Sequence, residues 1–292
     1  MKLINKKKVV MYMNQTLKPK KRSKLRLFLG KNYYTYKRYL LWLSPEYKFA
    51  KNKLDKDLKF KCFEHKSLLL RQLRDVDMVY QYNKITNLKI ATEKLDRIVI
   101  HPGETFSYWY LIGKTTKKKG YVPGMVLFCG TYKMDIGGGL CQLSNLIYWM
   151  TLHTPLTITE RYRHSYDVFP DSNRTQPFGS GATCVYPYRD LMITNNTSDD
   201  YELRITVGDT YLEGAWYSNH KPLYTYEIIE KNHEMKSEYF GGFSRHNELY
   251  RLVYNQDKEL VKEEYITENH ALMMYSPFLP ENIEDNHNNY QK

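Results

Sequence analysis

The chain has 292 residues, 42% of them hydrophobic, which is enough for one large domain or two modest ones. Its net charge of +12 is unevenly distributed, because the first 40 residues hold 13 Lys or Arg and no acidic residue, which leaves 31 basic and 32 acidic residues elsewhere. No stretch reaches the roughly 18 consecutive apolar residues of a transmembrane helix, and the apolar run at 9–13 is too short for a signal peptide. We therefore expect a cytoplasmic protein with a neutral body.

The basic charge belongs to a flexible tail that the composition places at residues 1–31. Such a tail usually binds an anionic surface, either the inner face of a membrane or nucleic acid. Because the body is neutral, nucleic acid is the weaker candidate, and the inner membrane face is the surface on which the protein could rest. The alternative is a solvated extension that binds nothing.

Several segments before residue 101 have the pattern of regular structure. Residues 32–53 are aromatic and amphipathic, which favours a short helix lying on the body or on a membrane surface. Apolar spacing predicts a helix over 65–80, and a second helix runs from an N-cap at Asn87 to Leu95. A short strand at 98–100 follows.

The clearest helix lies at 143–152, where apolar residues fall at i, i+3, i+4 and i+7 and Pro155 ends the pattern. After it the period changes to two, as expected for strands. We predict strands near 156–162, 182–187, 190–195, 201–207 and 211–217, with more alternating runs from 222 onward.

This order of elements predicts the α+β class, with N-terminal helices and a central helix that bears a cysteine, packed on a mainly antiparallel sheet. We expect three parts in the chain. After the tail, an α+β domain covers 32–220, and a β-rich extension or subdomain covers 221–292.

Three glycines stand directly before the central helix, in the run Gly137–Gly138–Gly139–Leu140–Cys141. Glycine permits backbone conformations that a Cβ forbids. A thiol at a helix N-terminus has a lowered pKa, because the macrodipole and unpaired N–H groups stabilise the thiolate. The run therefore predicts a nucleophile at Cys141, and a small residue buried in a tight turn is the alternative.

None of the four cysteines forms a C-x-x-C pair, which argues against a zinc ribbon or a thioredoxin-like motif. We therefore expect neither a metal nor a cofactor.

A thiol nucleophile needs a base and an orienting group. His164 lies at the end of one predicted strand and Asp190 at the start of another. The order Cys, His, Asp along the chain occurs in papain-like and transglutaminase-like thiol enzymes. By this analogy alone, a papain-like or transglutaminase-like arrangement of the fold is possible. In the alternative, Cys141 packs in the core while His164 and Asp190 hold a loop by hydrogen bonds.

Four further residues are candidates for substrate binding. The Gln142 amide could donate to an oxyanion together with the N–H groups of the helix start, or it could cap the helix. Glu104 could serve a site, or it could accept backbone N–H bonds of the Pro-Gly turn beside it. Arg161 and Arg163 would suit a carboxylate-bearing ligand if they converge.

Several of these motifs occur together in one known family. They match in order over about residues 65–210, and the sequence resembles the VanW family there. Gly181 stands where that family commonly has an Asp, which leaves Asp190 as the better acid. The motifs that carry the resemblance are 83–91, 101–109, the glycine–cysteine run, 160–164, and Arg189-Asp190-Leu191 with the following Asn195-Asn196-Thr197.

That family is named after an accessory protein of glycopeptide-resistance gene clusters in Gram-positive bacteria. The resemblance therefore implies a cell-envelope or antibiotic-resistance setting, without implying a reaction. Two functions stay open, so whether the protein is an enzyme is undecided at this point. It could be a thiol hydrolase or transferase acting on an amide or peptide linkage of a cell-wall precursor, or it could bind peptidoglycan or a glycopeptide without catalysis.

Overall fold

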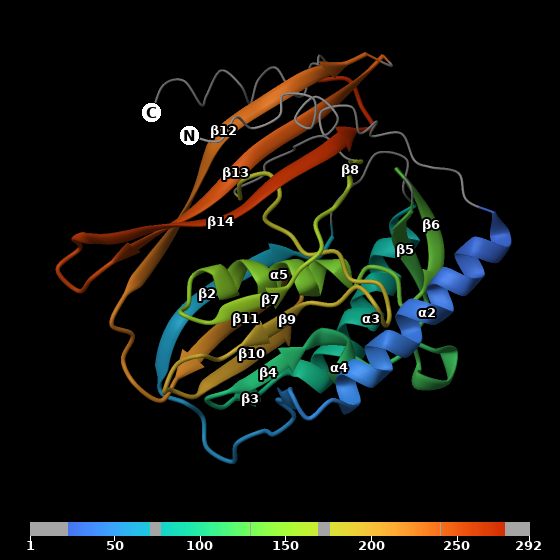
Figure 1. Ribbon diagram of the computed structural model, residues 1–292. Helices are drawn as coiled ribbons and strands as arrows, with labels where there is room; N and C mark the ends of the chain where they lie inside the picture. Colours follow the sequence, from blue (N-terminus) through green and yellow to red (C-terminus); the bar gives the residue numbers. More distant parts are fainter. Residues whose placement is uncertain (1–22, 71–76, 129, 169–175, 240, 278–292) are drawn as a thin grey trace.

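The computed structural model describes residues 23–70, 77–128, 130–168, 176–239 and 241–277. The first 22 residues of the basic tail lie outside them, as does Cys129. In the described part, helices combine with mainly antiparallel sheets (Figure 1), which confirms the α+β class. The helices are α2 (Lys24–Leu43), α3 (Met78–Leu95), α4 (Tyr108–Ile112), the short 3-10 helix η1 (Lys117–Lys119) and α5 (Cys141–Leu152).

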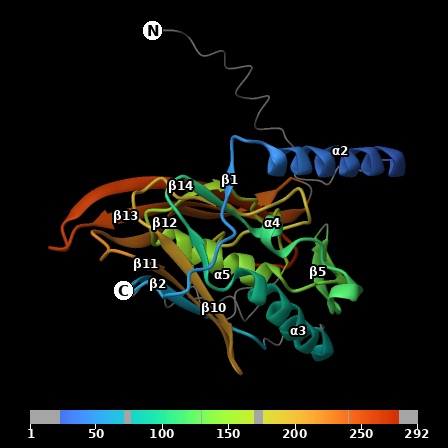
Figure 2. The same cartoon turned by 90° about the horizontal axis from the view of Figure 1, so that it is seen from below.

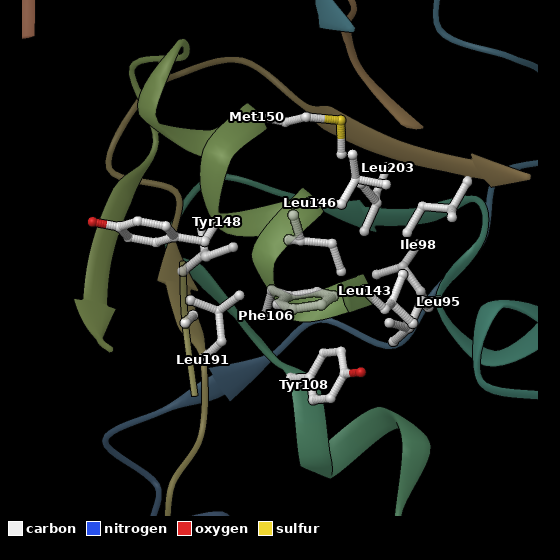
Figure 3. Close-up of a cluster of buried hydrophobic side chains, with 14 of the residues drawn as sticks. Leu95, Ile98, Phe106, Tyr108, Leu143, Leu146, Tyr148, Met150, Leu191 and Leu203 are labelled. Atoms are coloured by element: carbon white, nitrogen blue, oxygen red, sulfur yellow. The ribbon is translucent and has the colours of Figure 1, made fainter. Parts of the chain in front are cut away.

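Helix α5 is the centre of the core, and its position confirms the helix that the apolar spacing predicts. Nine of its 12 residues are buried, so it is covered on nearly all sides rather than along one stripe. Leu143 and Leu146 point into a cluster of side chains from other elements (Figure 3). That cluster includes Leu95, Ile98, Phe106, Tyr108, Leu191 and Leu203.

Two four-stranded sheets contribute to this core. The first has the order β2-β11-β10-β3 and is antiparallel throughout. The second has the order β1-β4-β9-β7, in which only β1 and β4 are parallel. The strands of the first are β2 (Phe60–Leu68), β3 (Ile98–Ile100), β10 (Tyr201–Val207) and β11 (Tyr211–Ser218), and those of the second are β1 (Lys48–Phe49), β4 (Glu104–Ser107), β7 (Thr157–Glu160) and β9 (Met192–Thr194).

A third sheet consists mainly of the C-terminal part of the chain and extends beyond the body (Figure 1). Its order is β12-β13-β14-β8, and its fourth strand comes from the middle of the chain and runs parallel to β14. The residues after 221 are thus rich in strands, whereas the domain boundary itself stays a prediction. The strands are β8 (Tyr166–Asp167), β12 (Thr225–Glu238), β13 (Gly242–Tyr254) and β14 (Leu260–Met273), and a separate hairpin pairs β5 (Pro123–Phe128) with β6 (Thr131–Ile136).

The glycine run before α5 is held by a contact between two backbones. Gly138 lies so close to Gly124 of β5 that a Cβ on Gly138 would come within 2.1 Å of the Gly124 carbonyl. The buried Asn87 amide joins the same place, donating to the carbonyl of Gly138 at 2.9 Å and that of Val122 at 3.0 Å. Its oxygen accepts from the Val122 N–H at 2.9 Å. This contact requires glycine and determines where α5 begins.

The two helices predicted at 65–80 and from Asn87 to Leu95 are wrong in part. Helix α3 begins ten residues or so earlier than predicted, because Asp77 is its N-cap and accepts from the Val79 N–H at 2.9 Å. Asn87 is an interior residue of that helix. The stretch Phe60–Leu68 is strand β2, where the prediction has the start of a helix, because pairing along the whole length of β11 outweighs a short apolar spacing.

The predictions for the remaining elements hold for most strands. Helix α2 begins at Lys24, with the Ser23 hydroxyl accepting from the Arg26 N–H, and ends at Leu43. Residues 24–31, which the sequence assigns to the tail, therefore belong to this helix. Segment 182–187 forms only a bridge from Val185 to Arg189, which is a correction. The strands predicted near 98–100, 156–162, 190–195, 201–207 and 211–217 are confirmed as β3, β7, β9, β10 and β11.

The substitution Gly138→Ala tests the backbone contact. We expect it to lower the free energy of unfolding by about 3 kcal/mol, because the added methyl group meets backbone that must shift. Urea unfolding measures the change. Gly30→Ala is the matched control, since nothing lies within 4 Å of its Cβ and alanine favours a helix by up to about 1 kcal/mol. Equal stability of the two variants would contradict the steric account.

Candidate functional site

Cys141 is the first residue of α5, but its surroundings are not those of an activated thiol. Burial raises the pKa of the Cys141 thiol, and a hydrogen bond with the Cys184 backbone opposes the rise only in part. The N–H groups of the helix start are already engaged, with Gln142 donating to the Gly139 carbonyl at 3.2 Å. The expectation of a lowered pKa is therefore wrong, because desolvation outweighs the helix N-terminus.

Cys184 is the titratable neighbour of this thiol. Burial raises the pKa of Cys184 well above its usual value, and the charges of Asp190 and Cys141 raise it further. The chain before Cys184 is tied to α5, since the Ser144 hydroxyl donates to the Ala182 carbonyl at 2.7 Å. Cys141, Cys184 and Asp190 are acidic groups that lie close together. A negative charge on one of them raises the pKa of the others, so the cluster favours neutral thiols.

Asp190 is fully buried, and its carboxylate holds backbone and side chains of α4. It accepts from the Ser107 hydroxyl and, at 2.9 Å, from the Trp109 N–H. His164 is half-buried between β7 and β8. The catalytic roles predicted for Cys141, His164 and Asp190 stay predictions.

Gln142 and Glu104, two of the predicted substrate ligands, hold the fold together. The Gln142 amide donates to the Ser67 hydroxyl and the Leu68 carbonyl, both at 2.9 Å, and so ties α5 to the end of β2. Glu104 is buried and accepts from the His101 N–H at 3.1 Å, which is the turn-capping alternative. Substrate binding by either residue stays a prediction.

Arg161 connects the body of the protein to the C-terminal sheet through hydrogen bonds. Its guanidinium donates to the carbonyls of Gly179 and Gly181 and, at 3.1 Å, to the Asn269 amide oxygen on β14. The group also lies 4.9 Å from the centre of the Tyr148 ring. Burial lowers the pKa of Arg161. Because its donors are engaged by the protein, Arg161 mainly positions its neighbours.

A cleft of about 680 Å³ lies beside Arg161, between the C-terminal half of α5 and the strands β7, β13 and β14. Its volume is in the range of small-molecule sites. Glu268 is the one acidic residue in its lining, and Glu264, which is not a lining residue, forms an ion pair with Arg251 at 2.6 Å. Four arginines line it, and they are Arg161, Arg163, Arg189 and Arg251.

The cleft brings together two of the predicted site residues, Arg161 and Arg163. Burial lowers the pKa of Arg163, and the nearby charge of Arg161 lowers it further, which shows that the two cations repel each other. Arg163 also contacts the His270 ring, and Arg251 donates to the Thr154 carbonyl at 2.8 Å. The other predicted site residues, Cys141, Gln142, Glu104, His164 and Asp190, do not line this cleft.

Arg189 is, with Arg251, one of the two cleft arginines that the sequence analysis does not assign to a site. Its side chain is exposed, stands 5.8 Å from the centre of the Tyr162 ring, and makes no hydrogen bond or ion pair with any described residue. Its backbone is fixed by a two-way bridge to Val185 and by the Trp109 indole, which donates to its carbonyl at 2.9 Å. The only sequence clue was its place in the motif beside Asp190.

Over the described ranges, no helix is long and apolar enough to cross a membrane. The same residues contain no group of three or more His, Cys, Asp or Glu placed to hold a metal ion.

The fold and the site define an α+β protein with a half-buried cysteine at a glycine turn and a separate cleft lined by arginines. Residues 83–217 of the chain match the family model described as VanW like protein. Over these residues the chain is thus similar to VanW like proteins, as its motifs indicate.

Two curated proteins resemble the chain. It is 37% identical over 174 residues to the Vancomycin B-type resistance protein VanW of Enterococcus faecalis, which covers 60% of this chain and 63% of that relative. It is 32% identical over 82 residues to the uncharacterized protein YoaR of Bacillus subtilis, covering 28% of this chain and 27% of that protein. The matched part thus spans less than two thirds of either relative. No solved structure matches the chain.

The raised pKa of Cys141 predicts slow alkylation at neutral pH. We expect its rate with iodoacetamide to rise with pH without a plateau below pH 9, because only the thiolate reacts and burial disfavours it. Mass spectrometry of digested samples from pH 6 to pH 10 measures each cysteine separately, and Cys141→Ser identifies the peptide. A plateau below pH 8 would contradict this prediction and support a nucleophile.

The raised pKa of Asp190 predicts that the free energy of unfolding depends on pH. Burial raises its pKa from 3.8 to about 7, against the hydrogen bonds from Ser107 and Trp109. Between these values the native state holds a proton that the unfolded state has lost. The Asp190 contribution to stability therefore falls as pH rises from about 4 to about 7, by at most about 1.4 kcal/mol per pH unit.

Urea unfolding at pH 4 to pH 8 tests this contribution. Asp190→Asn cannot titrate, so its profile should be flatter than that of the wild type over this range. Asp257→Asn, at an exposed hairpin loop, serves as the control. Parallel profiles for Asp190→Asn and the wild type would rule out the raised pKa.

Proposed function

We propose that the protein is a ligand-binding accessory protein of the bacterial cell envelope, whose arginine-lined cleft binds the carboxylate of a peptide-like cell-wall fragment. One observation carries this proposal: the Arg189 guanidinium lines the cleft without a hydrogen bond to any described residue, whereas the guanidinium groups of Arg161 and Arg251 are engaged by the protein. Guanidinium groups pair with carboxylates through two parallel hydrogen bonds, which makes arginine well suited to this recognition.

Arg189 is the residue we expect to hold the carboxylate. Its donors are not engaged by described residues, and its backbone is rigidly placed. An anion bound beside it would also relieve the repulsion between Arg161 and Arg163. Two half-buried apolar side chains of the lining, Ile158 and Ile266, offer contact surface for the methyl groups of a short peptide.

The setting of the proposal comes from the relative in Enterococcus faecalis, whose name places it in vancomycin resistance. We extend that setting to this chain as part of the proposal. The ligand class that fits both the setting and the cleft is a peptidoglycan precursor or a glycopeptide with a free carboxylate.

An enzyme with Cys141 as nucleophile is the other function that the motifs allow. It would need a thiolate, whereas burial raises the pKa of Cys141. It would also need an orienting group, whereas the carboxylate of Asp190 accepts hydrogen bonds from Ser107 and Trp109. The cleft with four arginines lies elsewhere on the protein, so binding is the function that the geometry supports better.

Titration calorimetry with two matched muropeptides tests the cleft, one ending in a free carboxylate and the other in an amide. We expect the wild-type protein to bind the carboxylate form at least tenfold more tightly. Arg189→Gln should lose about tenfold or more in affinity for that form, because a charge-assisted hydrogen bond contributes roughly 1.5–3 kcal/mol.

Two control variants separate the alternatives. Lys221→Gln changes an exposed cation outside the cleft, and Cys141→Ala removes the thiol, so both should bind like the wild type. Equal affinity for the two muropeptides would overturn the proposal. Turnover of a muropeptide by the wild type, abolished in Cys141→Ala, would establish the enzyme instead.

A further inference from the structure

Helix α2 carries its apolar face outward. Residues spaced three, four and seven apart lie on one side of a helix, and in α2 this side is apolar and aromatic. A surface helix normally turns such a face toward the core. The outward stripe consists of Leu25, Leu29, Tyr33, Tyr36, Leu40 and Leu43, which are 57–81% exposed.

The opposite side of α2 is anchored to the body by buried polar contacts. Arg38 is only 6% exposed, pairs with Glu160, and lies 3.9 Å from Asp190. The Trp42 indole donates to the Ser107 hydroxyl at 3.2 Å. These contacts determine which side of the helix faces the protein, and Figure 2 shows α2 as a rod along one edge of the molecule.

The charge around the stripe has one sign. Within α2 the charged residues are Lys24, Arg26, Lys31, Lys37 and Arg38, and no acidic residue occurs anywhere in the first 40 positions. A contiguous apolar stripe marks a surface that another structure covers. The basic residues beside it require that this structure be anionic.

We propose that α2 is an interfacial helix through which the protein docks on an anionic lipid bilayer. The outward stripe enters the boundary between headgroups and acyl chains, while the lysines and arginines contact the anionic headgroups. Stable membrane attachment takes two such contributions, apolar burial and charge attraction, and α2 with the preceding basic residues supplies both.

A second copy of the chain is a weaker occupant of the same stripe. Packing two copies of α2 together would bring their basic residues close to one another without an acidic residue from either helix to neutralise them. The headgroups of an anionic bilayer remove this repulsion. Charge complementarity therefore favours the lipid surface over self-association.

Co-sedimentation of the full chain with lipid vesicles tests the proposal. We expect binding to vesicles of equal parts phosphatidylglycerol and phosphatidylcholine, and at least tenfold weaker binding to pure phosphatidylcholine. The triple variant Leu25→Gln, Leu29→Gln, Leu40→Gln should bind the anionic vesicles at least tenfold more weakly than the wild type. Its circular dichroism and unfolding midpoint should be unchanged, because the three side chains are exposed.

The matched control removes three apolar side chains elsewhere. Leu223, Leu260 and Val261 are 55–66% exposed and lie in or beside the C-terminal sheet, so their triple substitution by Gln should leave vesicle binding intact. Equal binding by the α2 variant and the wild type would overturn the proposal. So would a wild type that ignores anionic vesicles and sediments as a dimer that the α2 variant cannot form.

Discussion

The close contact between Gly138 and Gly124 is the constraint on which the rest of the site depends. Two backbones can approach this closely only where both residues lack a Cβ, and the buried Asn87 amide holds the contact by three hydrogen bonds. Helix α5 starts directly after it, so the contact sets the position of the central helix. The core and one wall of the cleft are then built on α5.

This constraint gives the glycine–cysteine run a structural meaning. Gly137 and Gly139 have φ values of 79° and 92°, which L side chains rarely adopt, and a Cβ on Gly139 would also meet the Lys84 side chain. The glycines are thus required for the turn itself. Cys141 follows as a small residue that fills a dry place beside Cys184, and the pKa that burial produces is the reverse of the one that the helix N-terminus alone would predict.

The sequence predicts features that depend on local periodicity and misses those that depend on distant neighbours. Helix α5 and strands β10 and β11 follow from apolar spacing, whereas the convergence of Arg161 with Arg163, which the sequence leaves open, is supplied by the folded chain. Asn87 was misplaced because its partners lie 35 and 51 residues away. Arg189 was missed because only the folded chain brings it to the wall formed by α5, β7 and β14.

One buried network connects α2 to the cleft. Arg38 of α2 pairs with Glu160 and donates to the Tyr188 carbonyl at 3.2 Å, and Glu160 in turn accepts from the Asp190 N–H at 3.1 Å. Arg189 stands between these two anchored residues, so the contacts that orient α2 also hold the backbone of the arginine that we expect to bind the ligand. The Arg38 side chain is 6% exposed and that of Glu160 20%, so water screens this ion pair only in part and the pair helps to fix α2 against the body. If α2 lies on a bilayer, the cleft is held at a fixed orientation to its surface.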